Sequence, residues 1–303
     1  MEWSSTTLRV LRAIAEAGSF TAAAAALGYT QSAVSRQVAV LERAAGAQLF
    51  ERGPGGVRLT TAGRTLLRHG SAALDEMDRA ERILQGADPT GATVRLGVFI
   101  SAGGALIPEA LALLKRRAPE VEVVTRDGSS PALTRSLRAS TLDLAVISSR
   151  SPYPPPDDQK PALQLDVLLE GDLLVAVPEK GDLGRAGSVT LAELQQARWI
   201  SSPHTPGDPG LGVWPALPQR PTVAHQARDW LSKLAMVAAG YGVTTLPPYL
   251  VGLVPSGVRL VGVSDGVPIT GRVLLARLPG AATPAVTELA GCVKEAATRL
   301  PLA

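Results

Sequence analysis

The chain of 303 residues has very little cysteine and lacks long apolar runs. Its single cysteine, Cys292, excludes an internal disulfide and a metal site built from several thiolates. The surrounding sequence ELAGCVKEAATRL favours a buried structural thiol on an amphipathic helix. Every apolar run is broken by Gly, Pro or charge before the roughly 18 residues needed to span a bilayer. The N-terminus does not resemble a signal peptide, so we expect a soluble, cytoplasmic protein.

Signatures of the common enzyme classes are also scarce. The sequence contains neither a G-x-G-x-x-G dinucleotide fingerprint nor a Walker loop, and GDLGRAG has the wrong spacing. His, Cys and acidic residues do not cluster as metal ligands. Ser201, His204 and Asp208 are close in sequence, but sequence proximity does not make a catalytic triad. We therefore expect no enzyme and no metal or organic cofactor.

Charge is distributed unevenly, although the net charge is only +3. Residues 1–68 carry eight arginines against four glutamates, whereas residues 69–91 carry two arginines against five acidic residues. All lysines lie at or beyond Lys115. Guanidinium groups bond phosphate and guanine bidentately. A basic segment made of arginine next to an acidic helix therefore predicts a polyanion partner for the N-terminus.

The stretch GSFTAAAAALGYTQSAVSRQVAVLE, residues 18–42, follows an amphipathic helix and predicts two further helices joined by a turn. The alanines of 22–27 favour a helix that a neighbour can approach closely. In the next helix Val34, Val38 and Leu41 share one face. The opposite face gathers polar side chains near its start: Gln31, Ser32, Ser35 and Arg36. This pattern is typical of a helix-turn-helix that reads base edges, and a solvated helix face is the alternative.

The next segment, LFERGPGGVRLT, predicts a strand, a turn and a second strand over 49–60. Such a wing carries Arg52 and Arg58 toward phosphate or the minor groove. A long helix is predicted over 61–86. Its apolar residues recur in two rows: Leu67, Leu74, Met77 and Leu84, and Leu66, Ala73 and Ala80. This stripe indicates pairing between two chains, and packing on its own domain is the alternative.

Taken in order, these motifs resemble the LysR-type transcriptional regulators. The resemblance covers residues 8–67 and includes GAQLFERGPGGVRLTTAG with the family's spacing. It implies a winged helix-turn-helix in 1–60, a dimerising linker helix in 61–86, and an effector-binding domain. The resemblance points to Gln31, Ser32, Ser35 and Arg36 for the major groove. It points to Thr30, Arg52 and Arg58 for the DNA backbone.

After a hinge predicted over 87–92, strands alternate with helices from residue 93 onward. This alternation predicts an α/β domain with a parallel sheet. The resemblance implies two lobes like those of periplasmic binding proteins. Lobe one is expected over 93–167 and 268–303, and lobe two over 168–267. The overall fold class is therefore α/β with an N-terminal winged helix-turn-helix.

A small-molecule effector is expected between the lobes, at strand ends and helix N-termini. Free amides and hydroxyls there suit an anion such as a carboxylate. The candidate contacts are Ser101, Ala102, Gly103, Ser129, Ser130, Ser201, Ser202, Thr205 and Gln226. Helix capping is the alternative for each serine. Residues 201–221 are dense in Pro and Gly where the family usually continues into a helix, and His204 and His225 lie near this wall.

The resulting prediction is a bacterial transcription factor that binds a partly palindromic operator on double-stranded DNA. We expect a homodimer or homotetramer, no membrane partner, and contact with RNA polymerase if the protein activates transcription. A transport-type solute-binding protein is the alternative suggested by two lobes, and the N-terminal winged helix argues against it.

Overall fold

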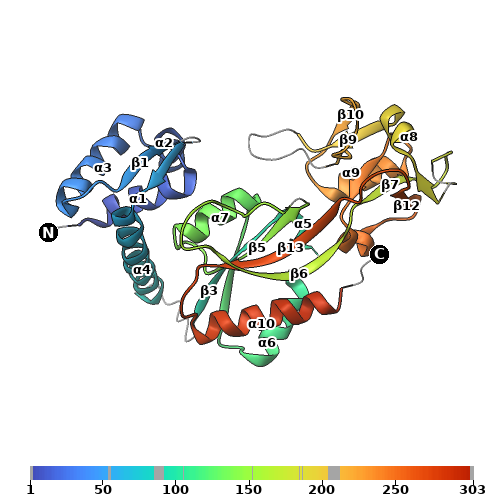
Figure 1. The fold of residues 1–303 in the computed structure, drawn as a ribbon. Helices are drawn as coiled ribbons and strands as arrows, with labels where there is room; N and C mark the ends of the chain where they lie inside the picture. The colour runs from blue at the N-terminus through green and yellow to red at the C-terminus, as the bar shows by residue number, and fades with distance from the viewer. Residues whose placement is uncertain are drawn as a thin grey trace.

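The computed structural model describes residues 3–53, 56–84, 92–104, 106–151, 153–183, 185, 187–203 and 212–300. Figure 1 shows the N-terminal helices at one end of the molecule, a five-stranded sheet in the middle and a smaller sheet at the far end. The expected order of a winged helix-turn-helix, a long helix and two α/β lobes is therefore present along the chain.

The N-terminal domain begins with the helices α1 (Ser5–Ala17), α2 (Phe20–Leu27) and α3 (Gln31–Ala45). Each helix starts after a hydroxyl side chain that accepts a backbone N–H bond, and each ends at a left-handed glycine. These pairs of caps are Ser4 and Gly18, Ser19 and Gly28, and Thr30 and Gly46. Small residues of α2 pack with Val34 and Val38 of α3, so α2 and α3 approach closely.

The wing is the antiparallel pair β1 (Phe50–Gly53) and β2 (Gly56–Leu59), in which Arg52 lies opposite Val57. It leads into the long helix α4 (Thr61–Leu84). Leu67 and Leu74 are buried against Leu8 and Leu11 of α1, so part of the apolar stripe packs within its own chain.

Other members of the α4 stripe remain at the surface. Met77 is 53% exposed, and Ala73 and Ala80 are exposed as well. The Leu84 side chain and the hinge residues 87–91 lie outside the described residues. The exposed part of the stripe is therefore available to a second chain.

Lobe one contains a sheet in the order β4 (Glu122–Asp127), β3 (Thr93–Val98), β5 (Leu144–Arg150), β13 (Thr270–Arg277), β6 (Gln164–Asp172). The strands β4, β3 and β5 are parallel, as expected, whereas β13 runs antiparallel to both β5 and β6. The reason is that β13 re-enters the sheet from lobe two, against the direction of the outgoing β6.

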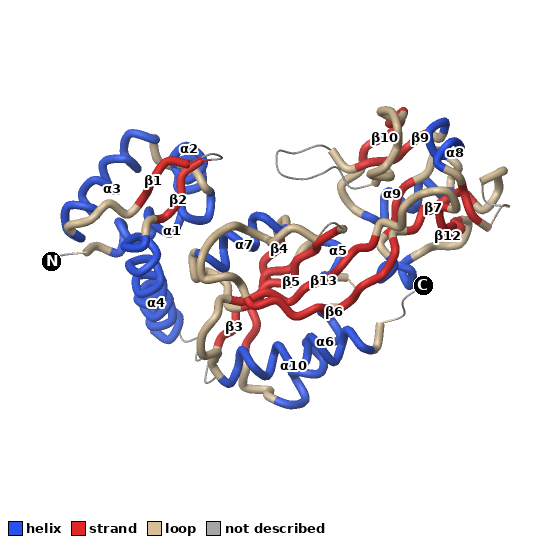
Figure 2. The backbone as a smooth tube through the Cα atoms, viewed as in Figure 1, coloured by secondary structure: helices blue, strands red, loops and turns tan. Residues whose placement is uncertain are grey.

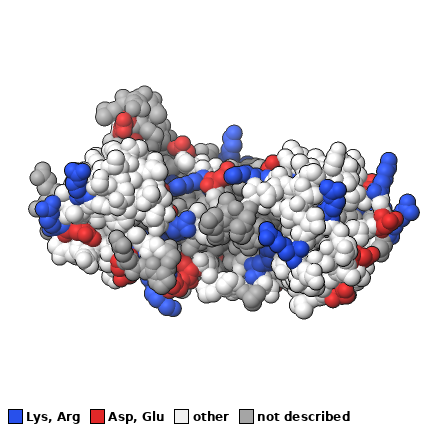
Figure 3. Space-filling view, turned by 90° about the horizontal axis from the view of Figure 1, so that it is seen from above, with Lys and Arg blue, Asp and Glu red and all other residues white. Residues whose placement is uncertain are grey.

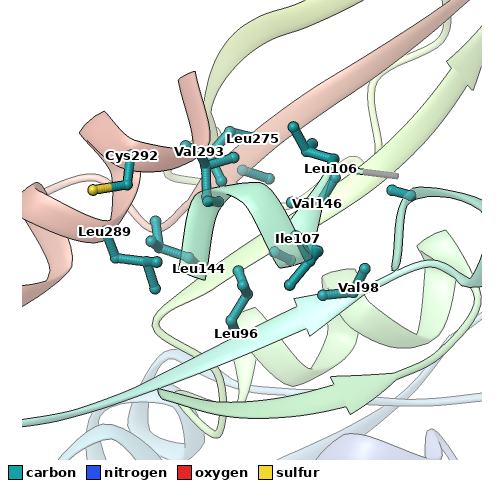
Figure 4. Packing of buried hydrophobic residues seen from close by; sticks show 14 of the residues in the cluster. Leu96, Val98, Leu106, Ile107, Leu144, Val146, Leu275, Leu289, Cys292 and Val293 are labelled. Carbon is teal, nitrogen blue, oxygen red and sulfur yellow. The ribbon is translucent and has the colours of Figure 1, made fainter. Parts of the chain in front are cut away.

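Helices cover both faces of this sheet, as Figures 1 and 2 show. The helices α6 (Ile107–Arg117) and α10 (Pro284–Thr298) lie on one face, and α7 (Ser130–Arg138) lies on the other. Figure 4 shows the core between the sheet and the first pair, to which Leu96, Val146 and Ile107 contribute, and Cys292 lies near Leu289 at its edge. The cysteine is fully buried, which agrees with the structural thiol that the sequence favours.

Lobe two holds a sheet in the order β11 (Thr244–Leu246), β7 (Leu174–Pro178), β12 (Val258–Val263), β8 (Ser188–Val189). A parallel pair, β9 (Arg198–Ser201) and β10 (Thr222–Gln226), lies beside it. Its helices are α8 (Leu191–Gln196), α9 (Trp230–Ala238) and the 3-10 helix η1 (Pro248–Leu253).

The crossing into lobe two lies later than the expected boundary at 167/168. The strand β6 continues to Asp172, and Asp172 pairs with Thr270 at the start of β13. The outgoing and returning chains are thus held side by side as two strands of one sheet, and the lobes meet where these strands end.

Candidate DNA-binding surface and effector cleft

The N-terminal end of α3 presents the predicted reading residues on one face. Gln31, Ser32 and Arg36 are exposed, and Ser35 is half-buried. The opposite face is buried in the domain through Val34, Val38 and Leu41. Burial of one face fixes the rotation of the helix, and so it fixes which polar side chains point outward.

Local hydrogen bonds organise this surface. Thr30 caps α3 by accepting a hydrogen bond from the Ala33 backbone N–H at 3.2 Å. The Gln31 side-chain amide donates to Ser35 Oγ at 3.0 Å. Arg36 makes no hydrogen bond or ion pair with any residue that the structure describes. The free guanidinium and the positive end of the α3 dipole both favour a negatively charged partner.

One further residue on this surface was not predicted. The side chain of Tyr29 is 50% exposed and lies in the turn immediately before Thr30. A phenol hydroxyl at this place can bond a phosphate oxygen. The sequence signal was a large aromatic residue in the turn between α2 and α3, where its side chain is not needed to fill the hydrophobic core.

The arginines of the basic segment differ in what they contact. Arg9 pairs with Asp78 and Arg12 pairs with Asp75, both on α4. Arg58 of the wing lies 3.0 Å from Asp158, in the segment between β5 and β6. The backbone of Arg52 lies on β1, while its side chain is outside the described residues. Part of the N-terminal positive charge is therefore paired within the chain.

The face of the molecule drawn in Figure 3 bears both basic and acidic side chains among the described residues. The two kinds of side chain are interspersed along this face.

In the effector domain, one buried hydrogen bond joins the two lobes. The indole N–H of Trp230, at the start of α9, donates to Ser101 Oγ at 2.6 Å. Ser101 belongs to α5 (Ile100–Gly103) in lobe one, so this bond crosses between the lobes. Tyr249 of η1 is close to Ser101, and burial raises the pKa of its phenol. Ser101 is thus the predicted effector residue that the structure brings to the other lobe.

A buried cation lies beside this bond. Lys233 is 1% exposed, its ammonium group donates to Ser202 Oγ at 2.8 Å, and it lies 4.5 Å from the centre of the Trp230 ring. Neither Trp230 nor Lys233 was predicted to be at the site. The available signal was a lysine within the apolar sequence of α9, where charge is costly unless it is paired.

Several predicted effector contacts have other roles. Ala102 is 2% exposed and packs in the core of lobe one, so its side chain cannot reach a ligand. Ser129 caps α7 by accepting from the Ala132 N–H at 3.4 Å. Ser130 Oγ accepts from the Ser148 N–H at 2.9 Å. The Ser129 hydroxyl thus caps a helix, which is the alternative expected for each serine, whereas the Ser130 hydroxyl bonds the backbone of β5.

The lobe-two candidates cluster at the ends of a strand pair. Ser201 and Gln226 lie opposite each other in the parallel pairing of β9 and β10, and Ser202 follows directly. Gly103 ends α5 in lobe one. Thr205 and His204 lie outside the described residues, as does the rest of 204–211 within the Pro/Gly-rich wall. The His225 ring packs edge-on against Tyr241, with 5.6 Å between ring centres.

Two hollows lie away from the contact of Trp230 with Ser101. One of about 290 Å³ is lined in lobe two by residues including Lys180, Arg198 and Tyr241. Another of about 570 Å³ lies between β6, β13 and α10. None of the predicted effector residues lines either hollow.

Within the described residues, a sequence string typical of hydrolases does not have the geometry of a nucleophile elbow. Ser264 stands in a G-x-S-x-G string, 262–266, but it follows β12 and bonds the Val189 carbonyl, whereas a nucleophile elbow joins a strand to a helix. The described residues contain no group of three or more His, Cys, Asp and Glu side chains able to hold a metal. Among the same residues, no helix is long and apolar enough to cross a membrane.

Comparison with known families agrees with this architecture. Residues 5–64 match the bacterial regulatory helix-turn-helix protein family of lysR type, and residues 87–298 match the LysR substrate binding domain. The chain belongs to the LysR family of transcriptional regulators, which are not enzymes. It combines a DNA-binding helix-turn-helix with an effector-binding domain.

Individual relatives are also regulators. A small neutral protease regulatory protein of Streptomyces coelicolor is 33% identical over 96% of this chain and 92% of that protein. A probable RuBisCO transcriptional regulator of Porphyra purpurea is 34% identical, but the match covers only 64% of this chain and 60% of that protein.

Solved structures share the fold. A full-length OxyR variant from Pseudomonas aeruginosa superposes with a TM-score of 0.59 at 20% identity, covering all of this chain and 97% of that one. Full-length CbnR in complex with its target DNA has a TM-score of 0.55 at 20% identity, over 97% of this chain and 100% of that one.

Proposed function

We propose that this regulator reads double-stranded DNA through the start of α3 and the wing, and that an anionic small molecule controls it. The observation that carries the DNA-reading part is the exposed polar face of α3, with Arg36 unpaired among the described residues. Gln31 and Arg36 are the side chains suited to bond adenine and guanine edges, and Ser32 and Thr30 suit phosphate.

The effector is proposed to bind between the lobes, next to Ser101, Ser202 and Lys233. A buried ammonium group and neighbouring hydroxyls favour a carboxylate or a similar anion. The anion replaces Ser202 as the partner of the Lys233 ammonium group. Its binding also alters the hydrogen bond between Trp230 and Ser101, which joins the lobes. Because a ligand shifts an equilibrium only through differential contacts, this bond is the natural place for the two states to differ.

The proposed assembly is a homodimer or homotetramer on a partly palindromic operator in the bacterial cytoplasm. The exposed residues Ala73, Met77 and Ala80 of α4 are proposed to contact the partner copy. Contact with RNA polymerase follows if the protein activates its promoters.

The test is sequence selection from random DNA with purified protein, followed by affinity measurements on the enriched site. Arg36→Ala is expected to weaken specific binding by about 1–3 kcal/mol if Arg36 reads a base. Arg43→Ala is the matched control, because Arg43 is exposed at the other end of α3. Equal losses on specific and random DNA would make Arg36 a phosphate contact, and failure to enrich any site would refute sequence-specific binding.

A further inference from the structure

The N-terminal domain is bonded to lobe one of its own chain at separate places. The first is the end of α1, where the Glu16 carboxylate bonds the Arg126 guanidinium of β4 at 3.2 and 3.3 Å. Arg135 of α7 donates to the Glu16 backbone carbonyl at 3.0 Å. One residue of α1 thus binds side chains from two elements of lobe one.

A second contact lies along α4 and is more deeply buried. Ser71, 1% exposed, donates to the Ala139 carbonyl at 3.2 Å, just beyond α7. Ala139 itself belongs to the same buried apolar cluster as Leu8 and Leu74. The two domains therefore share a core as well as surface charges.

Charges of alternating sign extend this contact into the sheet. Arg95 of β3 bonds Asp143 at 2.8 Å and also bonds Asp75 of α4. Asp75 in turn pairs with Arg12 of α1. A connected set of ion pairs holds its members in one arrangement better than isolated surface pairs do.

The third contact involves the wing, and it uses a residue with a predicted DNA role. Arg58 Nη1 bonds Asp158 Oδ2 at 3.0 Å. The residues beside Asp158 are fixed by buried Arg138, which bonds the Asp157 carboxylate and the carbonyls of Gln159 and Pro161. Asp158 is thereby presented to the wing from a segment that is itself held in place.

We propose that lobe one is a docking surface for its own DNA-binding domain, and that Asp158 competes with DNA phosphate for Arg58. The argument is electrostatic, since a carboxylate 3.0 Å from the Arg58 guanidinium offsets its positive charge and repels an approaching phosphate. Lobe one thus restrains the wing, and release of the docked state strengthens DNA binding by the same factor that DNA weakens docking. The inference rests on the proposed DNA-binding function of the wing.

The experiment measures affinity for a random-sequence 30-base-pair duplex at fixed salt, so it needs no known operator. Asp158→Asn is compared with Asp182→Asn, which removes the same charge from an exposed loop of lobe two. Both residues of the Arg58–Asp158 pair are substantially exposed, so the gain is modest: Asp158→Asn binds about two- to fivefold more tightly than Asp182→Asn. In an Arg58→Ala background, Asp158→Asn gives no gain over Asp182→Asn.

A second pair tests docking with residues that have no predicted DNA role. Arg126→Ala frees Glu16 of α1, and Arg116→Ala removes an equal charge from α6, on the opposite face of the sheet from α7. Loss of positive charge by itself weakens DNA binding, so the docking inference requires Arg126→Ala to bind more tightly than Arg116→Ala.

The outcomes separate the two levels of the argument. Wild-type protein that binds no duplex even at low salt overturns the DNA-binding function, and the docking inference with it. Wild-type binding with equal affinities for the Asp158 and Asp182 variants overturns docking alone. A gain in affinity from Asp158→Asn that persists in the Arg58→Ala background also overturns the docking inference. The gain would then come from the change in net charge and not from release of Arg58.

Discussion

Replacement of Arg138 by methionine removes a buried cation of lobe one that makes several hydrogen bonds. The Arg138 side chain is 6% exposed, and it bonds the Asp157 carboxylate twice at 2.8 Å. It also donates to the Pro161 carbonyl at 2.6 Å and to the Gln159 carbonyl at 3.2 Å. Methionine fills a similar volume but offers none of these hydrogen bonds, so a carboxylate that is only 15% exposed loses its counter-ion.

The expected loss in free energy of unfolding is about 3–5 kcal/mol, the usual cost of leaving a buried charge unpaired. The reasoning makes a sharper demand on the double variant Arg138→Met with Asp157→Leu. Because that variant removes the isolated charge as well, it should be more stable than Arg138→Met alone. Urea unfolding followed by circular dichroism measures both.

A cost below about 1 kcal/mol for Arg138→Met would refute the argument, since exposed ion pairs have values of that size. A double variant less stable than the single variant would refute the unpaired-charge explanation in particular.

Three further predictions concern stability. Leu74→Ala, at a fully buried contact of α4 with α1, should cost about 2–5 kcal/mol in thermal or urea unfolding, whereas Val267→Ala, at a side chain that is 78% exposed, should stay within about 0.5 kcal/mol. Gly63→Ala places a Cβ 2.1 Å from the Leu49 carbonyl and should cost at least about 2 kcal/mol, whereas Gly291→Ala meets no atom within 4 Å and should be neutral or stabilising. Burial raises the pKa of Cys292 above its ordinary value of 9.0, so its contribution is present below pH 9 and lost as the pH rises through the folded-state pKa. The urea midpoint of Cys292→Ala should therefore fall less than that of wild type between pH 8 and pH 10, and equal falls would contradict the assignment.

The N-terminal domain could be predicted almost completely, because its signals are local. The caps Thr30 and Gly46 and the apolar positions of α3 lie within one helix, and their spacing alone determines which face is buried. The wing is likewise set by glycines between two short strands. These features depend on residues that are close together in the sequence, so they can be predicted from one sequence alone.

The sheets were predicted less completely, because strand order and direction depend on distant segments. Residues 93–150 form the expected parallel unit, but the antiparallel return of β13 follows from the path through lobe two. The strand β12 and the helix η1 were missed, since Gly and Pro around 247–257 interrupt the pattern that identifies an element.

The candidate effector residues show the same limit at the level of side chains. Effector contacts were expected in the residues that follow the first strand, yet Ser101 faces the other lobe while Ala102 faces the core. A position after a strand locates the backbone but not the direction of each side chain. Trp230 resembles a core residue of α9, and its partner Ser101 is 129 residues away in sequence.

The positive charge of the N-terminal segment likewise depends on residues that are distant in the sequence. Arg9, Arg12 and Arg58 add to the basic count, but their carboxylate partners lie 69, 63 and 100 residues along the chain. The number of arginines therefore overstates the charge that faces DNA in the docked arrangement. Because Asp158 belongs to lobe one, a change in the effector domain alters that charge without any change inside α3. On our proposal, an effector signal needs only to reposition an acidic loop relative to the wing.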